Sequence, residues 1–185
     1  MKNNKFLLNV VSLFAFMIFT TSCDVLDTIK TFPVNIPITV NFSTSGSNSS
    51  MLQSSTFCVN NNDTYQEYKN DINELSYVEA AIRTISYSPS DVRGDIVLRV
   101  YDAVGNELFK EVLENVSPGD YVSEPYVIVL NTDEFNALNS YLQQALESGG
   151  EICLTAEFSM NITQGSAPYS FEGALDIVFE AKTTL

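Results

Sequence analysis

The chain has 185 residues, with 9 Lys and Arg against 23 Asp and Glu and no histidine. Its length suits a single domain, which typically has about 100–200 residues. Without histidine, catalysis by Ser-His-Asp or Cys-His groups, HExxH zinc binding and histidine-based pH switching are excluded. The acidic excess argues against nucleic acid and anionic lipid surfaces as partners, because like charges repel.

Residues 1–22 have the layout of a secretory signal peptide. Lys2 and Lys5 form a positive start, the stretch from Phe6 to Phe19 is almost wholly apolar, and small polar residues lead to Cys23. A membrane-spanning helix is the first alternative, but it needs about 20 apolar residues, and this stretch is shorter. An ordinary cleaved signal followed by a coincidental cysteine is the second alternative.

The ending Thr20-Thr21-Ser22-Cys23 resembles the lipobox of bacterial lipoproteins. In that family a diacylglyceryl group is attached to the cysteine, and the chain is cut just before it. The resemblance implies a lipid-anchored protein of the cell envelope, modified at Cys23, with residues 23–32 as a tether. The outer membrane is favoured over the inner membrane, although Asp24 resembles an inner-membrane retention signal.

Removal of residues 1–22 leaves 7 Lys and Arg against 23 Asp and Glu, a net charge of −16. Residues 33–182 are predicted to form one antiparallel β-sandwich of about seven or eight strands, because apolar and polar residues alternate between turn signals. Pro33 and Pro37 cannot donate ladder hydrogen bonds, so the first strand is predicted to lie at a sheet edge. Strands are expected at 33–43, 51–59, 75–87, 95–103, 107–113, 125–130, 151–160 and 169–181.

One amphipathic helix is predicted over residues 132–147. Asn131 and Glu134 have the spacing of a capping box, and Gly149 and Gly150 follow the helix as terminators. Its expected core-facing residues are Phe135, Leu138, Leu142, Ala145 and Leu146. Residues 64–70 are expected to form only a helical turn or coil. This architecture resembles that of small β-sandwich lipoproteins of Gram-negative bacteria, a resemblance that implies no functional residue.

Cys58 and Cys153 remain once Cys23 is assigned to lipid. If both strands alternate strictly, the two cysteine side chains point away from the apolar faces of their strands. Two exposed thiols in an oxidising compartment would be reactive, so we expect them to form a disulfide. The alternative is two separate, small buried hydrophobic residues.

Three other kinds of site were weighed on residue chemistry. Oxygen ligands for calcium could come from Asn60, Asn62 and Asp63, or from Asp91 and Asp95, but neither set has EF-hand spacing and ordinary turn chemistry explains both. A sugar site could use Tyr65 and Tyr68, although tyrosine in a sandwich is more often a sheet residue. A pair of carboxylates would suffice for a glycosidase, but 23 acids make such a pair uninformative.

GxSxG, GxGxxG, P-loop and SxxK motifs are absent. The sequence therefore predicts a non-catalytic, membrane-anchored envelope lipoprotein that acts through protein contacts, with no metal or cofactor and no nucleic-acid partner. A glycan- or calcium-binding accessory module is the alternative, and a carboxylate glycosidase is a third hypothesis.

Overall fold

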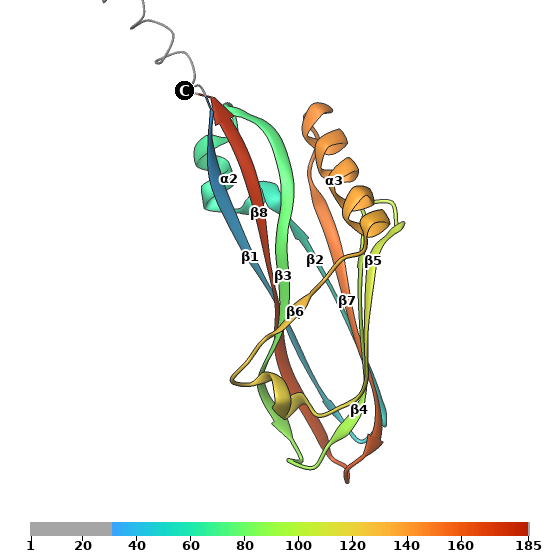
Figure 1. Cartoon of the computed structure of the whole chain (residues 1–185). Helices are drawn as coiled ribbons and strands as arrows, with labels where there is room; N and C mark the ends of the chain where they lie inside the picture. Colours follow the sequence, from blue (N-terminus) through green and yellow to red (C-terminus); the bar gives the residue numbers. More distant parts are fainter. Residues whose placement is uncertain (1–30, 185) are drawn as a thin grey trace, which may run out of the picture.

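A computed structural model of the chain describes residues 31–184. The predicted signal peptide, Cys23 and most of the tether lie outside these residues. The described part is a sandwich of two four-stranded sheets with two α-helices at one end (Figure 1). The strands are β1 Thr31–Gly46, β2 Ser50–Cys58, β3 Ile72–Ser88, β4 Arg93–Tyr101, β5 Glu107–Val116, β6 Tyr126–Ile128, β7 Cys153–Gln164 and β8 Tyr169–Thr184. The helices are α2 Asp63–Tyr68 and α3 Thr132–Glu147, with 3₁₀ turns at Val59–Asn61 and Pro118–Tyr121.

Strand order identifies the architecture. One sheet has the order β1-β8-β3-β6 and the other β2-β7-β4-β5, and every pairing is antiparallel. The pairs β1–β8, β2–β7, β3–β6 and β4–β5 arise when one long antiparallel ribbon wraps around a common core. This arrangement is the jelly roll, an eight-stranded double sheet. The predicted antiparallel sandwich is confirmed.

The first strand lies at a sheet edge, as its prolines predicted, because β8 is its one neighbour in the sheet order. The carbonyl oxygen of Pro37 accepts a hydrogen bond from Asn62 Nδ2 at 2.8 Å, so a side chain from the turn before α2 covers part of the open edge. β1 begins at Thr31, two residues earlier than expected, and Thr31 pairs with Thr184. The last two residues of the predicted tether therefore belong to the sheet.

The core follows from the alternation of apolar residues. In β4 and β7, residues alternate between buried and half-buried positions along most of each strand, as expected for strands with one face on the core. The ring of Phe158 on β7 stacks against Phe42 of β1 at 5.5 Å and against Phe171 of β8 at 4.6 Å, measured between ring centroids. These aromatic contacts join the two sheets.

Helix α3 forms over the predicted residues and with the predicted capping box. Asn131 Oδ1 accepts from the Glu134 N–H at 3.0 Å, and Glu134 Oε2 accepts from the Asn131 N–H at 3.0 Å. Leu138 and Leu142 are buried as expected, whereas Phe135 is 43% exposed. The expectation that Phe135 faces the core is therefore wrong. The other helix, α2, has six residues and forms where a short helical turn or coil was expected.

Helix α3 packs against β3 and β5, which belong to different sheets (Figure 1). β6 is shorter than the predicted strand at 125–130 and pairs with β3 only over Ala80–Ile82. The first half of β3 therefore has no strand neighbour on that side, and α3 fills the gap. Of the helices within residues 31–184, none combines the length and apolar composition needed to cross a membrane.

Candidate functional site

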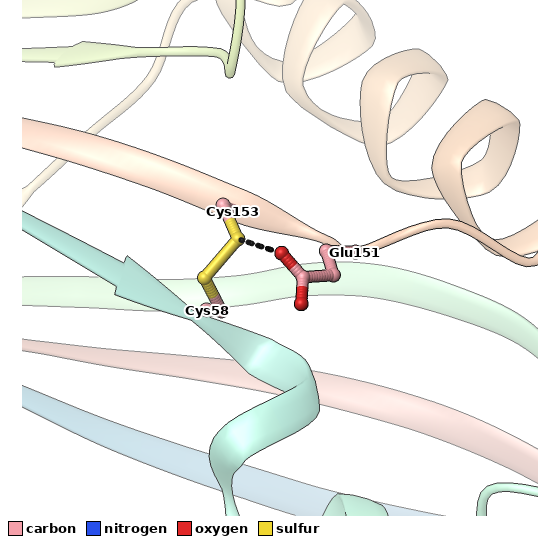
Figure 2. Close-up of side chains that lie close together, drawn as sticks. All are labelled: Cys58, Glu151 and Cys153. Atoms are coloured by element: carbon pink, nitrogen blue, oxygen red, sulfur yellow. Dashed lines mark hydrogen bonds between the residues drawn. A yellow bond between two sulfur atoms is a disulfide. The ribbon is translucent and has the colours of Figure 1, made fainter.

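The structure joins the two cysteines that the sequence singled out (Figure 2). Cys58 at the end of β2 lies directly opposite Cys153 at the start of β7, with 4.0 Å between Cα atoms and a 1.99 Å bond between sulfur atoms. Ile152 and Leu154 on either side of Cys153 are buried, so Cys153 projects from the outer face of its sheet. The disulfide therefore ties an edge strand to its one neighbour.

Glu151 lies beside this disulfide, with its Oε2 atom 3.9 Å from Cys153 Sγ (Figure 2). A disulfide sulfur has no hydrogen to donate, so this approach is a contact between the two groups. Cys58, Glu151 and Cys153 place three atoms of metal-ligand type within 4.8 Å of one another. Because only a thiolate binds metal well, the bonded sulfurs leave one carboxylate, which is too little for a metal centre.

Asn60 and Asn62, which were considered as calcium ligands, instead form hydrogen bonds that hold the loop between β2 and α2. Asn62 caps α2, its Oδ1 accepting from the Thr64 N–H at 2.9 Å while its Nδ2 donates to the Pro37 carbonyl. Asn60 Oδ1 accepts a short hydrogen bond from the Ile152 N–H. These oxygens serve the capping and turn roles typical of asparagine, which leaves them poorly placed to coordinate a cation.

The aspartates considered as calcium ligands do not lie together. Asp63 is the first residue of α2, and Asp95 Oδ1 accepts from the Asn115 N–H at 2.8 Å across the β4–β5 pair. Within residues 31–184, the cysteine cluster is the one group of three or more His, Cys, Asp or Glu side chains at metal-ligand spacing. The structure therefore does not bring Asp63, Asp91 or Asp95 into a cation site.

The two tyrosines considered for sugar binding pack α2 onto the sandwich. Tyr65 is buried in the core, and burial raises the pKa of its hydroxyl above the ordinary value. Tyr68 is half-buried and meets Phe32 edge to face, with ring centroids 5.9 Å apart. Tyr65 lines a hollow of about 570 Å³ beside the end of α3, but only 6% of the residue is exposed, so its ring offers little surface to a sugar.

A groove that the sequence did not indicate runs between β3 and α3. It has a volume of about 550 Å³. We call it the α3–β3 groove, and its lining residues are Glu74, Leu75, Ser76 and Tyr77 of β3 with Phe135, Asn139 and Gln143 of α3. The rings of Tyr77 and Phe135 meet edge to face with centroids 6.3 Å apart, which makes one wall aromatic.

Two amide side chains of α3 bind the free edge of β3 in this groove. Asn139 Oδ1 accepts from the Tyr77 N–H at 2.7 Å, and Gln143 Nε2 donates to the Asn73 carbonyl at 3.5 Å. Together they take the place of a neighbouring strand, one of the ways in which proteins cover a sheet edge. Gln143 Nε2 also donates to Glu147 Oε1 at 3.0 Å, which fixes the orientation of its amide.

Two buried polar atoms of the groove residues have no hydrogen-bond partner among the described residues. They are the Tyr77 hydroxyl and Gln143 Oε1. Burial raises the pKa of Tyr77 to about 12, and the backbone of Ala80 offsets part of the rise. The hydroxyl therefore stays protonated at neutral pH and remains a hydrogen-bond donor.

Charge in the groove is low. Glu74 is the single charged residue among those that line it, and both of its carboxylate oxygens accept from Lys182 Nζ, at 2.8 and 2.9 Å. An exposed ion pair of this kind adds little stability, but it neutralises the carboxylate. The groove can therefore bind by apolar contact and neutral hydrogen bonds, and its single acid lacks the second carboxylate that glycoside hydrolysis requires.

A second surface feature is a group of exposed valines at the β6 edge, which we call the β6 patch. Val127 on β6 is 57% exposed, Val129 just after it is 82% exposed, and Val78 on β3 is 47% exposed. Because β6 runs antiparallel to β3, the chain passes from Val127 toward the part of β3 that holds Val78. β6 is also the last strand in its sheet, so its outer edge lacks a strand neighbour among residues 31–184.

Comparisons with known proteins add little to this geometry. No protein-family model and no curated protein sequence matches the chain. Among solved structures, one of Desmodium yellow mottle tymovirus matches with a TM-score of 0.41, 10% identity and coverage of 84% of this chain and 89% of the other. One of tobacco necrosis virus has a TM-score of 0.41, 11% identity and coverage of 84% of both chains. Likeness at this level carries no argument about function, and the jelly-roll assignment rests on strand order.

Proposed function

We propose that this protein is a non-catalytic lipoprotein of the bacterial cell envelope, anchored through lipid on Cys23, that acts through protein contacts at the β6 patch. The observation that carries the contact role is that Val127 and Val129, two residues apart at β6, are both exposed beside an open strand edge. Single exposed apolar residues are common, but a group of them marks an interaction surface. An extended segment of a partner protein can add to such an edge and place side chains on the valines.

The position of the first residue of β1 supports the anchored arrangement. Thr31 pairs with Thr184 at the end of the sandwich that carries α2 and α3 (Figure 1). Seven residues separate Cys23 from Thr31, and they span at most about 25 Å when extended. Lipid on Cys23 would therefore keep this end of the domain close to the membrane. Of the two membranes, we favour the outer one.

Lipidation is tested by growing cells that produce the full chain with an alkyne-tagged fatty acid. We expect the protein to carry the label and to sediment with membranes, because two or more acyl chains anchor a protein stably. The Cys23→Ser variant should lose both properties, whereas the Cys58→Ser/Cys153→Ser variant should keep both. Labelled, membrane-bound protein after Cys23→Ser would contradict the lipobox interpretation.

The contact role is tested by placing a photo-crosslinking residue at position 127 of the full chain in intact cells. We expect one discrete adduct with another envelope protein, and Val129→Gln should weaken it. Val104→Gln is the matched control, because Val104 is 84% exposed against 82% for Val129 but lies in the β4–β5 turn. Equal adduct yield in both variants would refute the β6 patch, and an adduct of twice the chain's mass would make a second copy the partner.

A further inference from the structure

Glu151 holds its carboxylate against the disulfide (Figure 2). Its Oε2 atom lies 3.9 Å from Cys153 Sγ, and none of the ion pairs among residues 31–184 includes it. A bonded sulfur has no hydrogen to donate and no positive charge, so the disulfide gives this carboxylate no stabilising partner. The placement has a chemical use once the two sulfurs are no longer bonded to each other.

Reduction of the disulfide turns the same three residues into a set of metal ligands. Thiolates and carboxylates both bind Zn²⁺ in proteins, in a tetrahedron with metal–ligand distances of about 2.0–2.3 Å, so that the ligand atoms lie roughly 3–4 Å apart. The ligand atoms of Cys58, Glu151 and Cys153 already lie within 4.8 Å of one another. Small side-chain rotations are therefore enough to place all three around one ion.

Hydrogen bonds hold this arrangement without help from the disulfide. Just beyond the bonded pair, the Val59 N–H donates to the Ile152 carbonyl at 2.8 Å. The Asn60 side chain then spans Glu151, accepting from the Ile152 N–H on one side and donating to the Gly150 carbonyl at 3.5 Å on the other. None of these hydrogen bonds uses a sulfur atom, so breaking the S–S bond leaves the frame around the three ligands in place.

The three residues are accessible from solvent. Both cysteines are half-buried and Glu151 is exposed, so a reductant and then a metal ion can approach from outside. The net charge of −16 after Cys23 attracts cations toward the protein surface. A site with two thiolates selects soft or borderline ions such as Zn²⁺, whereas Mg²⁺ and Ca²⁺ prefer sites made only of oxygen ligands.

We propose that Cys58, Glu151 and Cys153 form a redox-gated zinc site, which the disulfide closes and reduction opens. In the opening step a dithiol gives up two electrons and two protons and becomes a disulfide, while the protein S–S bond breaks and two S–H bonds form. Zn²⁺ then displaces both thiol protons to solvent and binds the two thiolates and the carboxylate, with water in the fourth position. This site goes beyond the protein contacts of the β6 patch and does not depend on them.

The test uses the full lipidated chain in phosphatidylcholine liposomes, with and without a phosphine reductant. The phosphine breaks the disulfide, takes oxygen from water to become its oxide, and adds no competing thiol. Equilibrium dialysis measures bound Zn²⁺, and charge-transfer absorption with Cd²⁺ in its place reports thiolate ligands. We expect the reduced chain to bind a single Zn²⁺, and we expect neither the oxidised chain nor the Cys58→Ser/Cys153→Ser variant to bind it, because only a thiolate is a good sulfur ligand.

Glu151→Gln should raise the Kd of the reduced chain for Zn²⁺ at least about tenfold, since even groups that only support a metal ligand contribute about 10- to 100-fold in affinity. Glu157→Gln is the matched control, because Glu157 lies on the same strand but is bound to Arg99 at 3.2 Å, and it should leave the Kd unchanged. Circular dichroism follows the fold of the reduced chain, whose melting temperature Zn²⁺ should raise, because a ligand that binds the native state stabilises it.

The proposal is overturned if the reduced chain binds no more Zn²⁺ than the double serine variant does. It is also overturned if the oxidised chain binds Zn²⁺ as tightly as the reduced chain, or if Glu151→Gln and Glu157→Gln have the same Kd. A reduced chain that is unfolded without metal and stays unfolded with Zn²⁺ would overturn it as well.

Discussion

Replacing both disulfide cysteines, as Cys58→Ala with Cys153→Ala, tests the covalent bond between β2 and β7. The bond joins residues 95 apart in the sequence. In the chain-entropy relation, a loop of that length removes about 16 cal/mol/K of entropy from the unfolded chain, or about 4.7 kcal/mol at 25 °C. We expect the double variant to lose about 3–5 kcal/mol, because measured effects often fall below the relation. That is a large part of the roughly 5–15 kcal/mol that stabilises a typical domain.

The assay is urea unfolding followed by tyrosine fluorescence, since the chain has nine tyrosines and no tryptophan. The urea midpoint should fall and the m-value should rise, because the unfolded chain without its loop exposes more surface. The control is Thr56→Ala with Thr155→Ala on the same two strands. That change removes one exposed hydrogen bond of 2.9 Å and should cost less than about 1 kcal/mol.

Two results would refute the reasoning. One is a loss of free energy in the cysteine variant no larger than that in the threonine control. The other is the titration of two free thiols in denatured protein, beyond any from Cys23, when the protein has been purified from cells without reductant.

Leu142→Ala should cost about 2–5 kcal/mol of unfolding free energy, because Leu142 is fully buried on the core-facing side of α3. A cost below about 0.5 kcal/mol would place α3 away from the core. Burial alone would raise the pKa of Asp102, but hydrogen bonds from the β4–β5 turn hold this pKa below its ordinary value. The ionised carboxylate therefore stabilises the fold above about pH 4, and this stability is lost as the pH falls through the lowered pKa. Asp102→Ala should therefore cost about 1–3 kcal/mol at pH 7 and less at pH 2.5 in urea unfolding, and a pH-independent cost would contradict this. Gly94→Ala should lower stability by about 1–3 kcal/mol, because the new Cβ would collide with the Asn161 main chain, while Gly46→Ala, with open space around it, should show no such collision in a thermal melt.

Local patterns were sufficient to predict several features of this protein. The limits of α3 and its capping box depend on neighbouring residues, which is why Asn131 and Glu134 identified the helix start. The edge position of β1 followed from Pro37, because a proline cannot join a ladder on both sides. Period-two alternation predicted the sandwich, since the face that a strand residue occupies depends only on its parity.

Pairing partners, by contrast, were decided only in the tertiary structure. Thr31 pairs with Thr184, and no local rule specifies a contact over such a separation. The Cys58–Cys153 pair was predicted from the count of cysteines, but the register that places β2 beside β7 was not. The α3–β3 groove exists because β6 is short and leaves part of β3 to α3, which brings Tyr77 and Phe135 together. Phe135 matched the apolar stripe of the helix and yet is half exposed. A helix that bridges two sheet edges buries only the side chains that reach between the sheets, and their positions depend on packing rather than on periodicity.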